Sequence, residues 1–225
     1  MGLREFVSLL FPNECPACGG FLHIREQLIC TSCLGSLPFN RHINAEEAMM
    51  MYWHGRNQAQ GLNYLLKFEK QDIVQDILHH IKYKGRKDLA FAMGKLMGRQ
   101  VKFNGQNISG IVPVPLHSSK LKERGYNQSE RISAGIGQEL NIPVWNDFLV
   151  RKKKTSTQTK KSREERIANV ADVFSVSDKY SKSPSLSVLL VDDVLTTGAT
   201  LDSCCDALGK ANLQAPALAV LAIAQ

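Results

Sequence analysis

The spacing of apolar residues predicts a helical middle followed by alternating strands and helices. From Asp72 apolar positions recur every three or four residues, as on one face of a helix, until a break at Lys84-Gly85. A second helical stretch runs from Leu89 to Val101. The later apolar runs predict strands at Ile108–Val114, Ile142–Trp145, Asp172–Val176, Leu186–Val191 and Ala217–Ile223, with helices near Ser129–Leu140 and Gly198–Lys210.

Strands that alternate with helices favour an α/β domain, built on a mainly parallel sheet flanked by helices. We expect this domain at residues 106–225. Residues 51–105 are expected to form a helical segment that packs on it, and residues 1–50 a cysteine-containing module and connector.

Two pairs of residues with reactive side chains lie inside the predicted helices. His79 and His80 have no partner nearby in the sequence, so a surface or packing role is favoured over catalysis. Cys204 and Cys205 follow Leu201 at the spacing of a helix's apolar face, which predicts core packing.

Composition narrows the class of protein. The chain has 225 residues, of which 44% are hydrophobic, enough to bury a core and to exclude disorder over most of its length. Its net charge of +7 suits phosphate-rich partners but does not separate nucleic acid from a phosphorylated metabolite. No apolar run approaches the ~18 residues of a membrane helix. The N-terminal stretch before the first cysteine pair is too short for a signal peptide, and the charges of Arg4 and Glu5 also argue against one. We therefore expect a soluble, cytoplasmic protein without membrane insertion.

Four of the six cysteines form two C-x2-C pairs, Cys15 with Cys18 and Cys30 with Cys33, separated by eleven residues. Two such turns can direct four thiolates at one tetrahedral ion. Two disulfides or buried free thiols are the alternatives, and a reducing cytoplasm disfavours the disulfides. We favour structural zinc, with iron as a minor alternative. Four thiolates leave no open position on the metal, which predicts a role in folding rather than in catalysis.

The segment Leu186–Thr200 joins a buried strand, an acidic pair and a loop that opens a helix. Ligands of open α/β sheets bind beyond the carboxyl ends of strands. The loop brings backbone N–H groups and threonine hydroxyls to a helix N-terminus, an anion site for one phosphate. Asp192 and Asp193 offer carboxylates to a diol, and because side chains alternate along a strand, both reach one sugar only if regular strand geometry ends near Val191. The alternative is that a threonine only caps the helix and that the two aspartates face water. This alternative does not explain why the acidic pair and the threonine loop are adjacent in the sequence.

Neither the P-loop motif nor the Rossmann glycine motif occurs in the chain. The segment instead resembles the binding signature of type I phosphoribosyltransferases, the enzymes that use 5-phosphoribosyl-1-diphosphate (PRPP). The resemblance implies that Asp192 and Asp193 hold the ribose hydroxyls as the catalytic acids. It assigns the 5′-phosphate to Thr196, Thr197, Gly198, Ala199 and Thr200.

A second segment, Ile111–His117, resembles the first strand of that family and the pyrophosphate loop after it. The resemblance implies that the loop residues Pro115, Leu116 and His117 face the diphosphate. Lys120, Lys122 and Arg124 follow closely and can add charge-assisted contacts to phosphate. The alternative is an ordinary proline-rich turn with a basic, solvated face.

Residues 151–166 are polar and cationic and lack apolar periodicity, which is typical of a mobile loop. Type I enzymes carry a flexible loop that closes over PRPP at this place between strands, so the resemblance implies PRPP contacts for Arg151 and Thr155. Contact with nucleic acid through the same cations is the competing interpretation, and the sequence leaves both uses open.

The whole layout resembles the ComF family, competence-associated proteins in which a cysteine zinc module is fused to a type I phosphoribosyltransferase-like domain. The family marks are the paired cysteines, the PRPP signature, Lys82–Gly85, Val112–His117, Arg124–Gln128, Thr155, Gln158, Arg163, Arg166 and Asn169. The resemblance implies Mg²⁺ bound with PRPP, pyrophosphate release, and partners in DNA uptake such as single-stranded DNA or competence and recombination proteins. The alternative is a non-catalytic protein that senses PRPP or nucleotides or assists DNA processing. No residue cluster identifies the acceptor.

Overall fold

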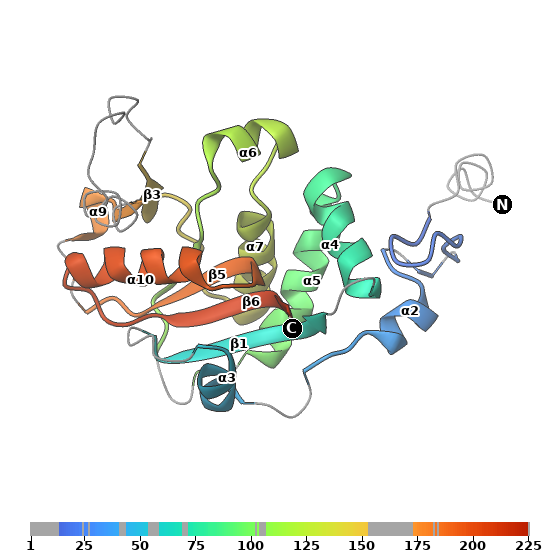
Figure 1. The fold of residues 1–225 in the computed structure, drawn as a ribbon, viewed down its shortest axis with the longest axis horizontal. Coiled ribbons are helices and arrows are strands. Elements are labelled where there is room, and N and C mark those ends of the chain that lie inside the picture. Colours follow the sequence, from blue (N-terminus) through green and yellow to red (C-terminus); the bar gives the residue numbers. More distant parts are fainter. Residues whose placement is uncertain are drawn as a thin grey trace.

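The computed structural model describes residues 14–23, 25–26, 28–40, 44–53, 59–68, 72–101, 103, 107–152, 173–181, 183 and 185–224. Within them, a four-stranded sheet has the order β1-β6-β5-β2, and every neighbouring pair of its strands is parallel (Figure 1). The strands are β1 (Gly61–Phe68), β2 (Gly110–Pro113), β5 (Val188–Leu195) and β6 (Ala217–Ala224). The central strands β5 and β6 are almost uniformly apolar because helices cover both faces of a parallel sheet.

Two apolar clusters fill the two sides of this sheet. On one side Leu189 and Val191 of β5 pack with α4 (Ile73–Tyr83), α5 (Lys87–Gln100) and α7 (Gln128–Leu140). On the other side Val188 and Leu190 pack with α10 (Ala199–Lys210) and α3 (Ala45–Tyr52). Because side chains alternate between the two faces of a strand, β5 contributes to the apolar clusters on both sides of the sheet. Cys204 and Cys205 lie in the second cluster and are buried, which confirms their predicted packing role.

The helices α5 and α7 approach each other closely enough to exclude side chains at their crossing. A Cβ added to Gly94 would lie 2.2 Å from the carbonyl oxygen of Ile132, and one added to Gly135 would lie 2.1 Å from that of Phe91. Because only glycine avoids these overlaps, the crossing depends on both glycines. The contact holds the middle of the chain firmly against the later α/β region.

The predicted parallel sheet flanked by helices is confirmed, with differences in detail. The strand predicted at Asp172–Val176 is β4 (Phe174–Val176), which pairs antiparallel with β3 (Leu149–Arg151) in a separate two-stranded sheet. The prediction of a strand at Ile142–Trp145 is wrong, because the segment forms only one isolated bridge, between Val144 and Ile111. Its second residue is a proline, which cannot donate to a ladder.

Several elements lay outside the predictions. The segment expected to be helical, residues 51–105, also contributes β1, the edge strand that pairs with β6. Helix α6 (Ser118–Arg124) buries none of its residues, so its sequence lacks the apolar periodicity from which a helix is predicted. The four-residue helix α9 (Asp178–Ser181) is too short to show a period. In the N-terminal module, α2 (Thr31–Ser36) begins at the second cysteine pair, and Figure 1 shows it at the opposite end of the molecule from β3 and α9.

Candidate functional site

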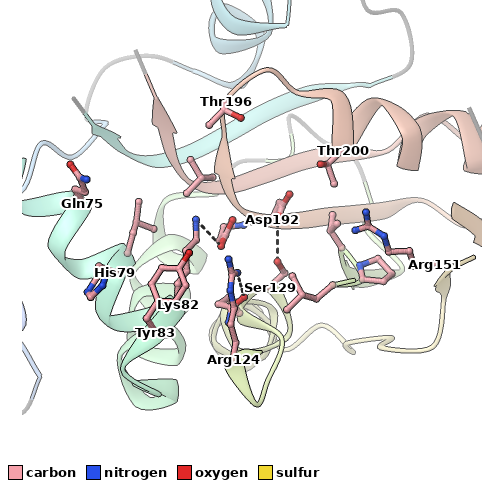
Figure 2. A pocket seen from close by; sticks show the side chains of 17 residues that line it. Gln75, His79, Lys82, Tyr83, Arg124, Ser129, Arg151, Asp192, Thr196 and Thr200 are labelled. Atoms are coloured by element: carbon pink, nitrogen blue, oxygen red, sulfur yellow. Dashed lines mark hydrogen bonds and ion pairs between the residues drawn. The ribbon is translucent and has the colours of Figure 1, made fainter. Parts of the chain in front are cut away.

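A cavity of about 620 Å³ opens at the carboxyl ends of β5 and β2 (Figure 2). It brings together many of the residues singled out from the sequence. Those that line it are Pro115, Leu116, Arg124, Arg151, Asp192, Asp193, Thr196 and Thr200. Figure 2 shows Thr196 and Thr200 on one side of Asp192, with Arg124 and Ser129 on the other.

Both aspartates border this cavity although β5 remains a regular strand. The expectation that strand geometry ends near Val191 is wrong, since β5 continues to Leu195. Its neighbour β2, however, stops pairing where Pro113 meets Val191. Beyond that point β5 has a partner strand only on the β6 side, so side chains from both of its faces reach the open edge.

The Asp192 carboxylate lies in a partly buried, polar environment. Its Oδ1 accepts hydrogen bonds from the Ser129 hydroxyl at 3.0 Å and from the backbone N–H of Asp193 at 2.8 Å. Burial, and then the neighbouring charge of Asp193, raise the pKa of Asp192 to about 7 in spite of these bonds and of the Lys82 ammonium. Near neutral pH this group is therefore poised between its charged and neutral forms, as expected in a ligand site rather than on an open surface.

The Asp193 carboxylate has a different partner. Its Oδ2 lies 3.3 Å from the Nζ of Lys82, which comes from the last turn of α4. The preceding residue holds this end of α4 in place, because the Ile81 carbonyl accepts a hydrogen bond from the buried hydroxyl of Tyr126. An element from the middle of the chain thus contributes a cation to the acidic pair.

The loop before α10 leaves the N-terminus of that helix open to a ligand. The N-cap is Gly198, with a left-handed φ of 76° and no side-chain hydrogen bond to the first turn. No threonine therefore caps α10 from the N-cap position, and the first-turn N–H groups have no side-chain cap to compete with an anion. Thr196 and Thr200 line the cavity on either side of this turn, whereas Thr197, Gly198 and Ala199 are not part of its wall.

The opposite wall carries aromatic and cationic side chains. The Arg124 Nη1 donates to the Gln128 Oε1 at 2.8 Å, and its guanidinium carbon lies 5.3 Å from the ring centre of Tyr83. The buried Nε of Arg124 has no hydrogen-bond partner among the described residues. Tyr83 is 51% exposed and packs against His79 with their ring centres 5.2 Å apart. This wall presents a positive charge, held in place, to the cavity.

Sequence reasoning missed several of these wall residues. His79, Lys82 and Tyr83 line the cavity, and their spacing along α4 places them on one helix face. That spacing was the available signal, together with the Lys82–Gly85 family mark. Neither the spacing nor the family mark shows that this face of α4 lies against β5. That contact depends on how α4 packs in the folded protein.

Two of the predicted PRPP-binding residues, His117 and Lys120, have other surroundings. The His117 ring is the N-cap of α6, with Nδ1 3.2 Å from the backbone N of Ser119 and 2.6 Å from its hydroxyl. The exposed Lys120 pairs with Glu123 at 3.5 Å. Thr155 and the rest of residues 153–172 lie outside the described residues. Arg151 lines the cavity, with its guanidinium carbon 5.2 Å from the ring centre of Phe174.

The four N-terminal cysteines form a second site. The Sγ atoms of Cys15, Cys18, Cys30 and Cys33 all lie within 4.8 Å of one another, and those of Cys18 and Cys30 are 3.9 Å apart. A tetrahedral ion with bonds of ~2.3 Å separates its sulfurs by ~3.8 Å, whereas a disulfide requires ~2.05 Å. All four cysteines are free. The cluster therefore fits a metal such as zinc, and the disulfide alternative is excluded in this structure.

Backbone donors favour a thiolate at Cys15, whereas burial and the neighbouring cysteines raise the pKa of the Cys33 thiol. The N–H of Cys30 points at the Cys15 sulfur and that of Cys33 at the Cys30 sulfur, each at 3.4 Å. Burial opposes ionisation of Cys15, but backbone N–H donors, led by that of Cys30, outweigh it and lower the pKa of its thiol to about 7. Gly19 follows the first pair with a φ of 70°, which the turn back to the second pair requires.

Comparison with known proteins finds relatives along the chain. Competence protein F of Haemophilus influenzae (strain Rd) is 28% identical over 225 residues, which is 91% of this chain and 94% of that protein. Competence protein ComFC of Bacillus subtilis (strain 168) is 31% identical over 91 residues, 40% of this chain and 34% of that protein. The DNA utilization protein YhgH of Escherichia coli (strain K12) is 27% identical over 134 residues, 57% of each chain. No family model matches.

Two solved structures show a partial likeness to this fold. The glutamine PRPP amidotransferase of Bacillus subtilis has a TM-score of 0.45 at 16% identity, covering 63% of this chain and 30% of that one. The adenine phosphoribosyltransferase of Leishmania tarentolae has a TM-score of 0.36 at 13% identity, covering 63% and 73%. Among the described residues no helix is long and apolar enough to span a bilayer. The protein is similar to competence protein F along nearly its whole chain and carries a four-cysteine cluster near its N-terminus, and in both features it resembles the ComF family.

Proposed function

We propose that the cavity binds PRPP as its Mg²⁺ complex, and that the protein transfers the phosphoribosyl group to an acceptor and releases pyrophosphate. The observation that carries this proposal is the meeting of an acidic pair and an open helix N-terminus in one cavity. Asp192 and Asp193 line it beside Thr196 and Thr200 at the start of α10. The names of the relatives, competence and DNA utilization proteins, further suggest that this activity serves DNA uptake.

Each part of PRPP has a matching partner in the cavity. The threonine hydroxyls and first-turn N–H groups of α10 suit the 5′-phosphate, because a helix N-terminus favours an anion. The two carboxylates suit the ribose hydroxyls, which are hydrogen-bond donors. Arg124 and Arg151 suit the diphosphate, since guanidinium groups form charge-assisted hydrogen bonds with phosphate oxygens.

The proposed reaction is displacement at the anomeric carbon. A nucleophile forms a bond to this carbon while the bond to the diphosphate oxygen breaks, and the electron pair leaves with pyrophosphate. Positive charge that develops on the ribose ring is stabilised by Asp192 and Asp193, and negative charge on the leaving group by Arg124 and Arg151. Bound together with PRPP, Mg²⁺ would supply charge neutralisation for the diphosphate.

We also propose that the four-cysteine cluster holds zinc with a structural role. Four thiolates complete a tetrahedral shell and leave no position for a substrate. Within the described part of residues 14–40, the buried side chains are those of Cys15, Pro16, Cys33 and Leu37. With so small a core there, the metal would provide much of the free energy that folds the module. This assignment is independent of the cavity and is tested separately.

Isothermal titration calorimetry with Mg²⁺-PRPP tests the proposed function. The wild-type protein is expected to bind saturably, and both Asp192→Ala and Asp193→Ala to lose binding. The matched control is Asp178→Asn, which removes one exposed carboxylate at the start of α9, away from the cavity. A wild-type protein that fails to bind PRPP would refute the proposal.

Turnover is measured as pyrophosphate release from PRPP with a panel of bases and amines as acceptors. Release that depends on Asp192 and Asp193 is expected for a transferase. Saturable binding without release for any acceptor would instead favour the alternative, a non-catalytic PRPP or nucleotide sensor.

A further inference from the structure

The cavity contains an ion pair that the assignments above do not use. The Lys82 Nζ lies 3.3 Å from Asp193 Oδ2, and the two side chains are 22% and 15% exposed. The ammonium therefore takes one of the acceptor positions that the Asp193 carboxylate offers to ribose hydroxyls. A sugar whose hydroxyls use both oxygens of Asp193 competes with Lys82 for this contact.

The backbone at Lys82 is held in place while its side chain has freedom to move. Ile81 is fully buried, and its carbonyl accepts the hydrogen bond from Tyr126. The lysine head group, by contrast, sits on a flexible four-carbon stem with three rotatable donors. Lys82 can therefore exchange partners inside the cavity without a rearrangement of α4.

The other cations of the cavity wall are more constrained. Arg124 is hydrogen-bonded to Gln128 and lies over the Tyr83 ring, and Arg151 lies over the ring of Phe174. Figure 2 shows the Lys82 and Arg124 side chains reaching toward Asp192 from the same side of the cavity. A lysine freed from Asp193 would thus lie near Arg124, one of the two arginines proposed to bind the diphosphate.

We propose that Lys82 leaves Asp193 when the ribose hydroxyls bind and pairs with the diphosphate, so that it selects PRPP over ribose 5-phosphate. This inference rests on the proposed function, because it requires PRPP in this cavity. The ligand-free pair neutralises Asp193, and the exchange carries the same positive charge to the incoming anion. A ligand without a diphosphate offers the freed ammonium no new partner, so Lys82 does not favour its binding.

The charge balance makes the exchange favourable for PRPP. The diphosphate approaches two adjacent carboxylates, and like charges at short range repel strongly in a partly buried site. Lys82 reduces this repulsion most when its ammonium lies against the phosphate oxygens, because the attraction between opposite charges rises as their separation falls. If it stayed on Asp193, its attraction to the diphosphate would be weaker, and PRPP would gain less over ribose 5-phosphate.

The test compares two ligands in Lys82→Met, which keeps the length of the stem and removes the charge. Calorimetric titrations with Mg²⁺-PRPP and with ribose 5-phosphate give the ratio of the two dissociation constants. We expect affinity for PRPP to fall about tenfold or more, as for loss of a charge-assisted hydrogen bond, and affinity for ribose 5-phosphate not to fall. The matched control is Lys84→Met, which removes the same charge from an exposed residue at the C-cap of α4.

The possible outcomes separate the roles of Lys82. Equal losses for both ligands would overturn the inference and make Lys82 a support for Asp193 alone, and unchanged affinities would overturn it as well. Because both ligands are titrated into one protein sample, a partly unfolded variant lowers the stoichiometry and not the ratio. Lys82→Arg keeps the charge and is expected to retain the preference for PRPP. A wild-type protein that binds neither ligand would instead refute the proposed function.

Discussion

Replacement of Asp192 by asparagine should stabilise the protein while destroying its ligand site. Burial and the charge of Asp193 raise the pKa of Asp192 to about 7 in the folded protein. In the unfolded chain an aspartate titrates near ~3.9. The folded state therefore carries a penalty that is absent below about pH 4, grows between about pH 4 and pH 7, and is constant above.

The difference of about 3 between the folded and unfolded pKa values of Asp192 corresponds to about 4 kcal/mol, which we take as an upper bound. Asparagine cannot ionise, and its amide oxygen can still accept the hydrogen bonds from Ser129 and from the N–H of Asp193. We therefore expect Asp192→Asn to raise the free energy of unfolding at pH 8 by about 2–4 kcal/mol.

Urea unfolding of both proteins at pH 8 and at pH 4.5, followed by circular dichroism, measures this difference. The gain should shrink as the pH falls toward 4.5, because Asp192 in the folded wild-type protein is then largely uncharged, as asparagine is in the variant. A variant no more stable than wild type at pH 8 would refute the electrostatic reasoning. A gain of equal size at both pH values would refute it too, since it would show an effect of packing.

Three further predictions concern the fold and the metal. Gly135→Ala places a methyl group 2.1 Å from the Phe91 carbonyl oxygen and should lower the free energy of unfolding by about 2–4 kcal/mol in urea titrations; a neutral result would mean that α5 and α7 separate easily. Tyr126→Phe removes the buried hydroxyl bonded to the Ile81 carbonyl and should cost about 1–3 kcal/mol by the same measurement, while an unchanged stability would show that water replaces this donor. Cys33→Ser should reduce the zinc content measured by mass spectrometry from about one per chain toward none, and retention of full zinc would contradict four-thiolate ligation.

Features that depend on short stretches of sequence were predictable. Helices α7 and α10 and strand β6 were predicted nearly to their observed bounds, because strong apolar periodicity or a continuous apolar run marks them. The cysteine pairs meet in one cluster, as their spacing indicates. The acidic pair and the loop after it lie at the carboxyl end of a strand, because a buried strand followed by a helix places that junction at the edge of a parallel sheet.

Other features required the tertiary structure. The end of β2 at Pro113 decides that both aspartates border the cavity, and nothing within β5 indicates it. Lys82 meets Asp193 only because α4 packs beside β5, and Arg124 faces the cavity because a short helix without apolar periodicity orients it. Periodicity along a chain decides which side chains share one face of one element. Which faces meet depends on how several elements pack at once, and that is why the sequence predicted the acidic pair and its loop but not the lysine that neutralises it.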